Sequence, residues 1–185
     1  PVHIAAGKGN IEVIRALAVH GADVNTSAHN GSTPVHVAAG KGNVEMIRAL
    51  TEMGSIVNAP DSHGNSPLYF AAAVGNVDAI RAFTAHGADI NIPNNYGTTP
   101  MLTSASEGRV GGVKALIELR GNIEYINNGG ISPLMAAVKY DQFEAASLLV
   151  NMGADVKRCL EASAPPSETC IHIREMVSEL AVRVG

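Results

Sequence analysis

Apolar residues recur along the chain at helical spacing, in short stretches separated by polar, glycine-containing segments. In the first clear stretch the apolar side chains lie three or four positions apart, at Ile11, Ile14, Leu17 and Ala18. This spacing places them on one face of a helix. The segment 26–32 that follows is mostly polar and contains a glycine, so it is predicted to be an exposed loop or hairpin tip. The alternation predicts short amphipathic helices joined by exposed loops.

The same pattern returns at a fixed period of 33 residues, which proline marks most clearly. The proline positions are Pro1, Pro34, Pro67, Pro100 and Pro133. Serine or threonine precedes all but the first, small pairs such as Ala38-Ala39 follow, and the first unit closes on Gly-Ala-Asp-Val-Asn at residues 21–25. A unit of this size cannot bury its apolar face alone, so the repeats must stack on one another.

Each recurring residue type fits one step of a loop, a short helix, a turn and a longer helix. Serine or threonine is a preferred helix N-cap, and proline suits the next position because its missing N–H is not needed there. Glycine suits the turn and the end of the second helix because it adopts left-handed backbone without strain. The predicted turn glycines are Gly9, Gly42, Gly75 and Gly108, the predicted second-helix caps are Asn10, Asn43 and Asn76, and the predicted second-helix ends are Gly21, Gly54 and Gly87.

This recurring text resembles the ankyrin repeat, whose hallmark is Thr-Pro-Leu-His followed by Ala-Ala, Gly and later Gly-Ala-Asp-Val-Asn. Residues 32–39 read Ser-Thr-Pro-Val-His-Val-Ala-Ala, and residues 87–91 read Gly-Ala-Asp-Ile-Asn. The resemblance implies an all-α solenoid of stacked helix-turn-helix units with hairpin loops. It covers residues 1–156 in a partial first repeat, 1–27, and the units 28–60, 61–93, 94–126 and 127–156.

Units four and five depart from this pattern at their turns. Arg120 occupies the slot that glycine holds at the end of other second helices. Because left-handed backbone costs a non-glycine residue about 1 kcal/mol, we predict that Gly121 takes over this turn. Asp141 replaces the inter-helix glycine of unit five and tolerates left-handed backbone better than most residues, so we expect that turn to survive. The other departures are Leu102 and Met135 in the histidine slot and Ser104 in place of the first alanine.

The two ends of the chain fall outside the repeat pattern. Pro1 enters in mid-repeat without a capping threonine, and Val2 and Ile4 would leave an unprotected apolar face, so we expect the natural protein to extend upstream. After the last unit we predict a linker at 157–166 and a C-terminal helix at 167–185 that caps the stack. A partner-binding amphipathic helix is the alternative for this last segment.

The composition of the chain argues against several classes of protein. Apolar residues make up 46% of the chain and charged residues 16%, which excludes disorder of the highly charged kind. The net charge of −4 argues against a nucleic-acid-binding protein, which typically carries an excess of basic residues. No apolar run reaches the roughly 18 residues that a membrane span needs. Two cysteines cannot form a disulfide framework. We therefore expect a monomeric cytoplasmic array, with a nuclear location also compatible.

No motif in the sequence supports catalysis. There is no glycine-rich phosphate loop, no nucleophile elbow and no paired-histidine zinc motif. Cys159, Cys170 and His172 do not match an ordinary zinc-ligand spacing. We therefore expect no catalytic residue, no cofactor and no metal, and we predict that the protein is not an enzyme.

Recurring histidines, asparagines and charges have structural interpretations. Hydrogen bonds to loop backbone are predicted for His3 and His36, and a role at helix C-termini is predicted for His20 and His86. Bracing of adjacent loops is predicted for Asn25, Asn58 and Asn91; the family resemblance also permits hydroxylation of these asparagines. Ion pairs three residues apart on the second helices are predicted for Glu12/Arg15, Glu45/Arg48 and Asp78/Arg81.

The resemblance implies a protein-protein interaction scaffold or adaptor that binds another protein through its hairpin tips and concave face. A targeting module excised from a larger enzyme, channel or effector protein is the alternative. Carried onto this sequence, the partner-binding positions are Lys8, His29, Asn30, Ser32, Lys41, Ser62, His63, Asn65, Val74, Asn95, Tyr96, Thr98, Ser106, Glu107, Asn128, Ile131, Lys139 and Tyr140.

Two tyrosines stand out among these positions. Tyr96 and Tyr140 are large amphipathic aromatics, which are typical interface anchors, and they fall in the units that drift from the consensus. We therefore predict a binding site centred on units four and five, with Lys8 and Lys41 as a mildly basic N-terminal flank. Packing of Tyr140 against its neighbour is the structural alternative.

Overall fold

The computed structural model describes residues 1–162, Ile171 and Glu175, and within this part of the chain the regular elements are all α-helices. The first helices of the repeats are α1 (Val2–Lys8), α3 (Pro34–Lys41), α5 (Pro67–Val74), α7 (Pro100–Ser106) and α9 (Pro133–Lys139). The second helices are α2 (Ile11–Val19), α4 (Val44–Glu52), α6 (Val77–Ala85), α8 (Val110–Glu118) and α10 (Phe143–Asn151). The predicted C-terminal capping helix at 167–185 lies outside the described residues, apart from Ile171 and Glu175.

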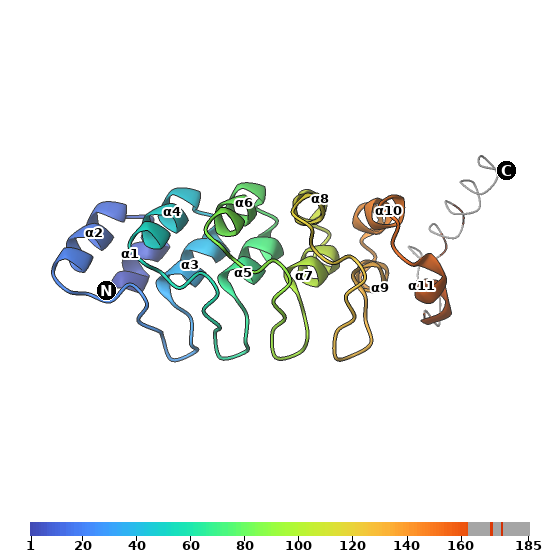
Figure 1. The fold of residues 1–185 in the computed structure, drawn as a ribbon, viewed down its shortest axis with the longest axis horizontal. Helices are drawn as coiled ribbons and strands as arrows, with labels where there is room; N and C mark the ends of the chain where they lie inside the picture. Colours follow the sequence, from blue (N-terminus) through green and yellow to red (C-terminus); the bar gives the residue numbers. More distant parts are fainter. Residues whose placement is uncertain (163–170, 172–174, 176–185) are drawn as a thin grey trace.

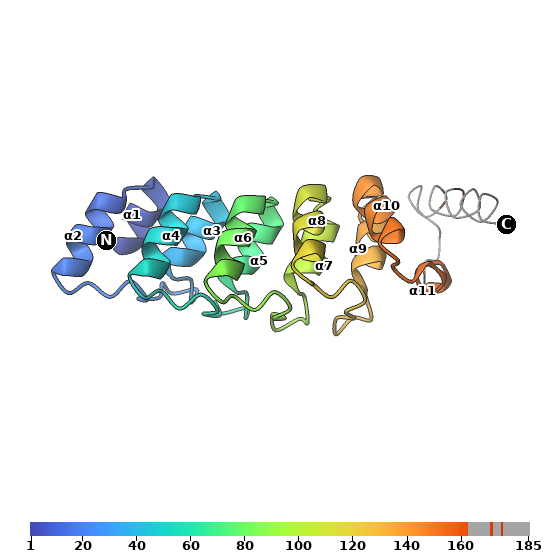
Figure 2. The same ribbon diagram turned by 45° about the horizontal axis from the view of Figure 1, so that its top comes forward.

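The helix pairs stand side by side in one row, and the loops between pairs project from one side of it (Figure 1). First helices pack against first helices, as α3 does against α1 and α5, and second helices pack against second helices, as α6 does against α4 and α8. Figure 2 shows the two layers along the row. The stacked all-α architecture predicted from the 33-residue period is confirmed.

The helices begin at the predicted caps. At the start of α4, Asn43 Oδ1 accepts the N–H of Met46 at 2.9 Å. At the start of α5, Ser66 Oγ accepts the N–H of Tyr69 at 3.3 Å. The same arrangement occurs at Asn10, Asn76, Thr99 and Ser132. Each bond satisfies one of the amide groups that a helix start leaves without an intrahelical partner.

Asparagine side chains brace one loop against the next, as predicted. Asn25 donates from Nδ2 to the carbonyl of Gly54 at 3.1 Å and accepts the N–H of Ile56 at 2.8 Å. Asn58 repeats this pattern one unit later with Gly87 and Asp89, and Asn91 accepts the N–H of Asn122 at 2.8 Å. The side chains of adjacent units therefore satisfy loop backbone that the helices cannot reach.

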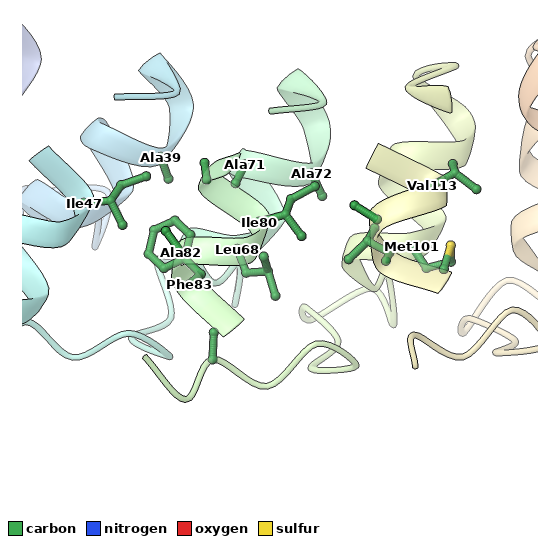
Figure 3. Close-up of a cluster of buried hydrophobic side chains, with 14 of the residues drawn as sticks. Ala39, Ile47, Leu68, Ala71, Ala72, Ile80, Ala82, Phe83, Met101 and Val113 are labelled. Atoms are coloured by element: carbon green, nitrogen blue, oxygen red, sulfur yellow. The ribbon is translucent and has the colours of Figure 1, made fainter. Parts of the chain in front are cut away.

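Buried side chains form one core that runs along the row between the two layers. Phe83 is the largest fully buried side chain and lies in the same cluster as Leu68 and Ile80 (Figure 3). The paired alanines Ala71 and Ala72 are fully buried, and their small size lets neighbouring helices approach closely. Most of the core consists of small aliphatic side chains, as the low aromatic content of the sequence predicts.

The prediction for the turn at Arg120 is wrong. Arg120 itself adopts left-handed backbone, with a φ of 67°, and Gly121 does not. The N–H of Arg120 bonds to the carbonyl of Ile117 and that of Gly121 to the carbonyl of Leu116, which repeats the turn of the other units. A Cβ on Gly121 would meet the Leu116 carbonyl oxygen at 2.9 Å. These bonds, together with the bond from the N–H of Asn122 to Asn91 of the preceding unit, fix the register of the turn, and Arg120 therefore takes the strained left-handed position. By contrast, Asp141 is left-handed at a φ of 54°, so that prediction is confirmed.

Arg120→Gly is expected to stabilise the protein by about 1 kcal/mol, because glycine adopts this backbone without strain. Urea unfolding followed by circular dichroism measures the change. Arg120→Ala is the matched control, since it removes the same charge but keeps a Cβ. A gain that is equal in both variants would assign the effect to charge and contradict the strain at this turn.

The predicted linker is partly helical. Residues 157–162 belong to α11 (Val156–Ala162), which packs against α9. Cys159 is fully buried there and belongs to the core cluster. The apolar side chains of this segment thus extend the core past the fifth repeat, where the sequence pattern had ended.

None of the three predicted ion pairs within the second helices forms among the described residues, and two of the three arginines pair with the next second helix instead. Arg15 Nη2 lies 3.3 Å from Glu52 Oε2, linking α2 to α4, and Arg81 Nη2 lies 3.0 Å from Glu118 Oε2, linking α6 to α8. Among the described residues these two are the ion pairs of the structure. The long arginine side chains cross to the next repeat, where their partner lies 37 residues ahead, instead of turning back one helical turn.

Candidate functional site

Two histidines tie successive hairpins together in the N-terminal units. Nε2 of His3 lies 2.8 Å from the carbonyl oxygen of Ser32, and Nε2 of His36 lies 3.1 Å from that of Asn65. Nδ1 of His36 accepts the N–H of Thr33 at 3.0 Å, so the ring proton is on Nε2, which donates to Asn65. The predicted scaffold role of His3 and His36 is confirmed. His20 and His86 cap their helices with Nδ1 close to the carbonyls of Ala16 and Ala82.

The electrostatics of this region serve the scaffold. Burial lowers the pKa of His36, although its hydrogen bond to the Asn65 carbonyl acts in the opposite direction. Burial alone would raise the pKa of Asp61, but hydrogen bonds from the Asn65 side chain and backbone and from the His63 backbone lower it below its usual value. The Asp61 carboxylate accepts these bonds at the turn of the hairpin, which holds the tip in one shape.

Leu102 occupies the histidine position in unit four and cannot make the bond to the following hairpin. At this place a cavity of about 150 Å³ opens between α7, α9 and their loops. Its lining residues are Thr98, Leu102, Ser106, Asn127, Ile131, Ala136, Lys139 and Tyr140. Leu102 is only 2% exposed and Tyr140 is 55% exposed, so the leucine belongs to the interior of the cavity and the tyrosine to its rim.

Five of the predicted partner-binding residues meet at this cavity: Thr98, Ser106, Ile131, Lys139 and Tyr140. Lys139 Nζ lies 5.6 Å from the centre of the Tyr140 ring, within the range of a cation–π contact. The cavity therefore combines an apolar interior with an exposed aromatic ring and a positive charge at one edge. This combination offers shape, apolar contact and a charge to a ligand.

The remaining predicted residues are spread along the hairpins and first helices. Exposed are Lys8, His29, Asn30, Lys41, Ser62, His63, Val74, Asn95, Tyr96, Glu107 and Asn128, and half-buried are Ser32 and Asn65. Tyr96 is 62% exposed but does not line the cavity of Tyr140. The two tyrosines are therefore both exposed but do not share one pocket.

The scaffold already uses several of the predicted polar side chains. Asn65 donates from Nδ2 to Asp61 and accepts from Asn94. Asn95 donates to the Ser62 carbonyl, and Asn128 donates to the Asn95 carbonyl. These asparagines hold neighbouring hairpin tips together, which leaves them less free for a partner than Lys139 or Tyr140.

Three lining residues, Leu102, Asn127 and Ala136, were not among the predicted positions. Leu102 had a signal in the sequence, since it places an aliphatic residue where the first two units have His3 and His36 and the third has Tyr69. Asn127 accepts the N–H groups of Gly129 and Ile131, so it shapes the hairpin beside the cavity. Its side chain faces both the turn and the cavity, and no residue pattern distinguishes these two roles.

A family model described as ankyrin repeats in three copies matches residues 2–94 and 83–158. These matches span the helix pairs from α1 to α10. The chain belongs to the ankyrin repeat family. Ankyrin repeats are in general protein-protein interaction modules and typically non-enzymatic. No match was found among curated proteins.

Other kinds of site find no support in the part of the ankyrin stack that the structure describes. No group of three or more histidine, cysteine, aspartate or glutamate side chains there is placed to hold a metal ion. None of the described helices has the length and apolar character needed to span a bilayer.

Proposed function

We propose that this ankyrin stack is a protein-binding scaffold or adaptor whose main contact lies on the hairpins and first helices of units four and five. The observation that carries the proposal is the cavity between α7 and α9, where five sequence-predicted residues meet. A partner side chain that enters it gains apolar contact with Leu102 and Ile131 and meets the Tyr140 ring at the rim. Interface energy concentrates in such pockets with aromatic neighbours.

Rigid presentation is the mechanism that we propose. Hydrogen bonds between successive tips, such as Asn95 N–H to the His63 carbonyl at 3.0 Å, hold the hairpins in place before a partner arrives. A preordered surface avoids part of the ordering cost of association. The exposed residues of the N-terminal hairpins and the basic flank of Lys8 and Lys41 extend the proposed surface along the row. A targeting module within a larger enzyme, channel or effector is the second form of the proposal, and it uses the same surface.

Tyr140→Ala is expected to weaken partner binding about tenfold or more, which is the scale of a hot-spot residue. Affinity capture from lysate of the source cells, followed by identification of the retained protein and titration of that purified protein, measures the change. Tyr96→Ala, outside the cavity, should cost less.

Val19→Ala is the matched control for this experiment. Val19 is 84% exposed at the end of α2, so its truncation removes exposed apolar surface far along the chain from the cavity. A partner that binds wild type and Tyr140→Ala with equal affinity, while both are folded, would refute a site at the cavity.

A further inference from the structure

The second helices carry a row of basic residues, Arg15, Arg48, Arg81 and Lys114, of which only Arg15 and Arg81 have an ion-pair partner among the described residues. Arg15 bonds to Glu52 at 3.3 Å, and Arg81 bonds to Glu118 at 3.0 Å. Each glutamate is the last residue of the next second helix, 37 positions after its arginine. The corresponding partner of Arg48 is Ala85, the last residue of α6, which has no charge to offer.

The structure has a cleft of about 700 Å³ where this partner is missing. It lies between α4 and α6, and both Arg48 and Ala85 line it. Both residues are exposed, and Arg48 has no ion pair among the described residues. A cationic side chain therefore borders a solvent-filled space at the position where its two counterparts hold a carboxylate.

We propose that this cleft, on the second-helix layer and away from the α7–α9 cavity, is a second docking site that accepts an aspartate or glutamate side chain of a partner protein. The partner's carboxylate takes the place that Glu52 and Glu118 fill for Arg15 and Arg81. The charge-assisted hydrogen bond to the guanidinium supplies the specificity.

The remaining charges of the cleft favour a single carboxylate over a phosphate group. Glu45 and Asp78 also line it, in the first turns of α4 and α6. They would repel the second negative charge of a phosphate more than the single charge of a carboxylate. Arg81 lines the cleft as well, but it is already paired with Glu118. Arg48 is thus the arginine of the cleft whose guanidinium is available to a ligand.

Ala85→Glu tests the proposal because it supplies the missing carboxylate within the chain. The full chain, labelled with ¹⁵N at arginine, is titrated with the blocked peptide acetyl-Ala-Ala-Glu-Ala-Ala-amide while the Nε–H signals are followed by NMR. Arg48→Lys assigns the Arg48 signal. We expect this signal to move and saturate with the peptide in wild type, and to need at least tenfold more peptide in Ala85→Glu.

Matched variants and probes distinguish carboxylate binding at Arg48 from a general response to added charge. Ala85→Gln, of the same size without the charge, should respond like wild type, as should Lys114→Gln, whose position is opposite Asn151 in the same row. Any of four results would overturn the proposal. Two concern the probes: movement of the Arg48 signal with the glutamine analogue of the peptide, or an equal or larger response to inorganic phosphate at matched ionic strength. The other two are no response to any probe and an unchanged response in Ala85→Glu. Tyr140→Ala should leave the Arg48 response unchanged, so this test and that of the α7–α9 cavity succeed or fail separately.

Discussion

Phe83→Ala is expected to lower the free energy of unfolding by about 3–5 kcal/mol, the cost of truncating a buried aromatic side chain. Phe83 has no exposed surface and is the largest fully buried side chain of the core. It lies on α6 in the middle of the row, where units on both sides can relax only partly into the space that it leaves (Figure 3). Urea unfolding followed by circular dichroism measures the loss.

Phe83→Leu is the matched control for this prediction. The other units have leucine at the corresponding position, namely Leu17, Leu50, Leu116 and Leu149. A leucine there meets a repeat geometry that already accommodates it, so we expect a cost below about 1.5 kcal/mol. Equal losses in the two variants would show that leucine cannot fill this site and that the core requires an aromatic ring there.

The period of the sequence predicts the fold of the described residues because every structural step repeats. Proline after a capping residue, the small pair and the turn glycine recur at fixed spacing, so an error at one position is corrected by the others. The helix caps and the asparagine braces were predicted for this reason. Each depends on contacts within one unit or with its immediate neighbour, and both units carry the same text.

The wrong predictions share one physical cause: contacts with the neighbouring units outweighed the preferences of the local sequence. Local preference moved the turn from Arg120 to Gly121, but hydrogen bonds to α8 and the bond from the N–H of Asn122 to Asn91 of the preceding unit hold its register. Likewise, the spacing of Glu12 and Arg15 predicted a pair within one helix, whereas the next repeat presents Glu52 at a better distance. Tertiary neighbours outweigh preferences of about 1 kcal/mol or less.

The candidate site was predictable in outline only. Exposure of Tyr140 and Lys139 follows from their position at the end of a first helix, and the structure places both at the cavity. The cavity itself depends on Leu102, which occupies the histidine position but cannot make the hydrogen bond to the next hairpin. The absence of a contact between two units leaves no repeating signal in the sequence, so it becomes visible only in the structure of the two adjacent units.

His36→Leu is expected to lower the free energy of unfolding at neutral pH by about 1–3 kcal/mol, because it leaves the buried N–H of Thr33 without its acceptor. The change also tests the protonation state of the ring. Nδ1 of His36 accepts from Thr33 while Nε2–H donates to Asn65, and only the neutral imidazole satisfies both. The leucine of unit four, Leu102, shows that the repeat accommodates this side chain.

The pH dependence has a definite sign. Burial lowers the pKa of His36 in the folded protein below 6.5, its ordinary value, so the unfolded chain binds more protons as the pH falls through this range. The stability that the neutral ring contributes is present above pH 6.5 and is lost as the pH falls toward the lowered pKa, by at most about 1.4 kcal/mol per pH unit. Unfolding free energies between pH 7.5 and pH 5 measure the loss, and wild type should fall more steeply than His36→Leu. Parallel slopes in wild type and His36→Leu would contradict a neutral, buried His36.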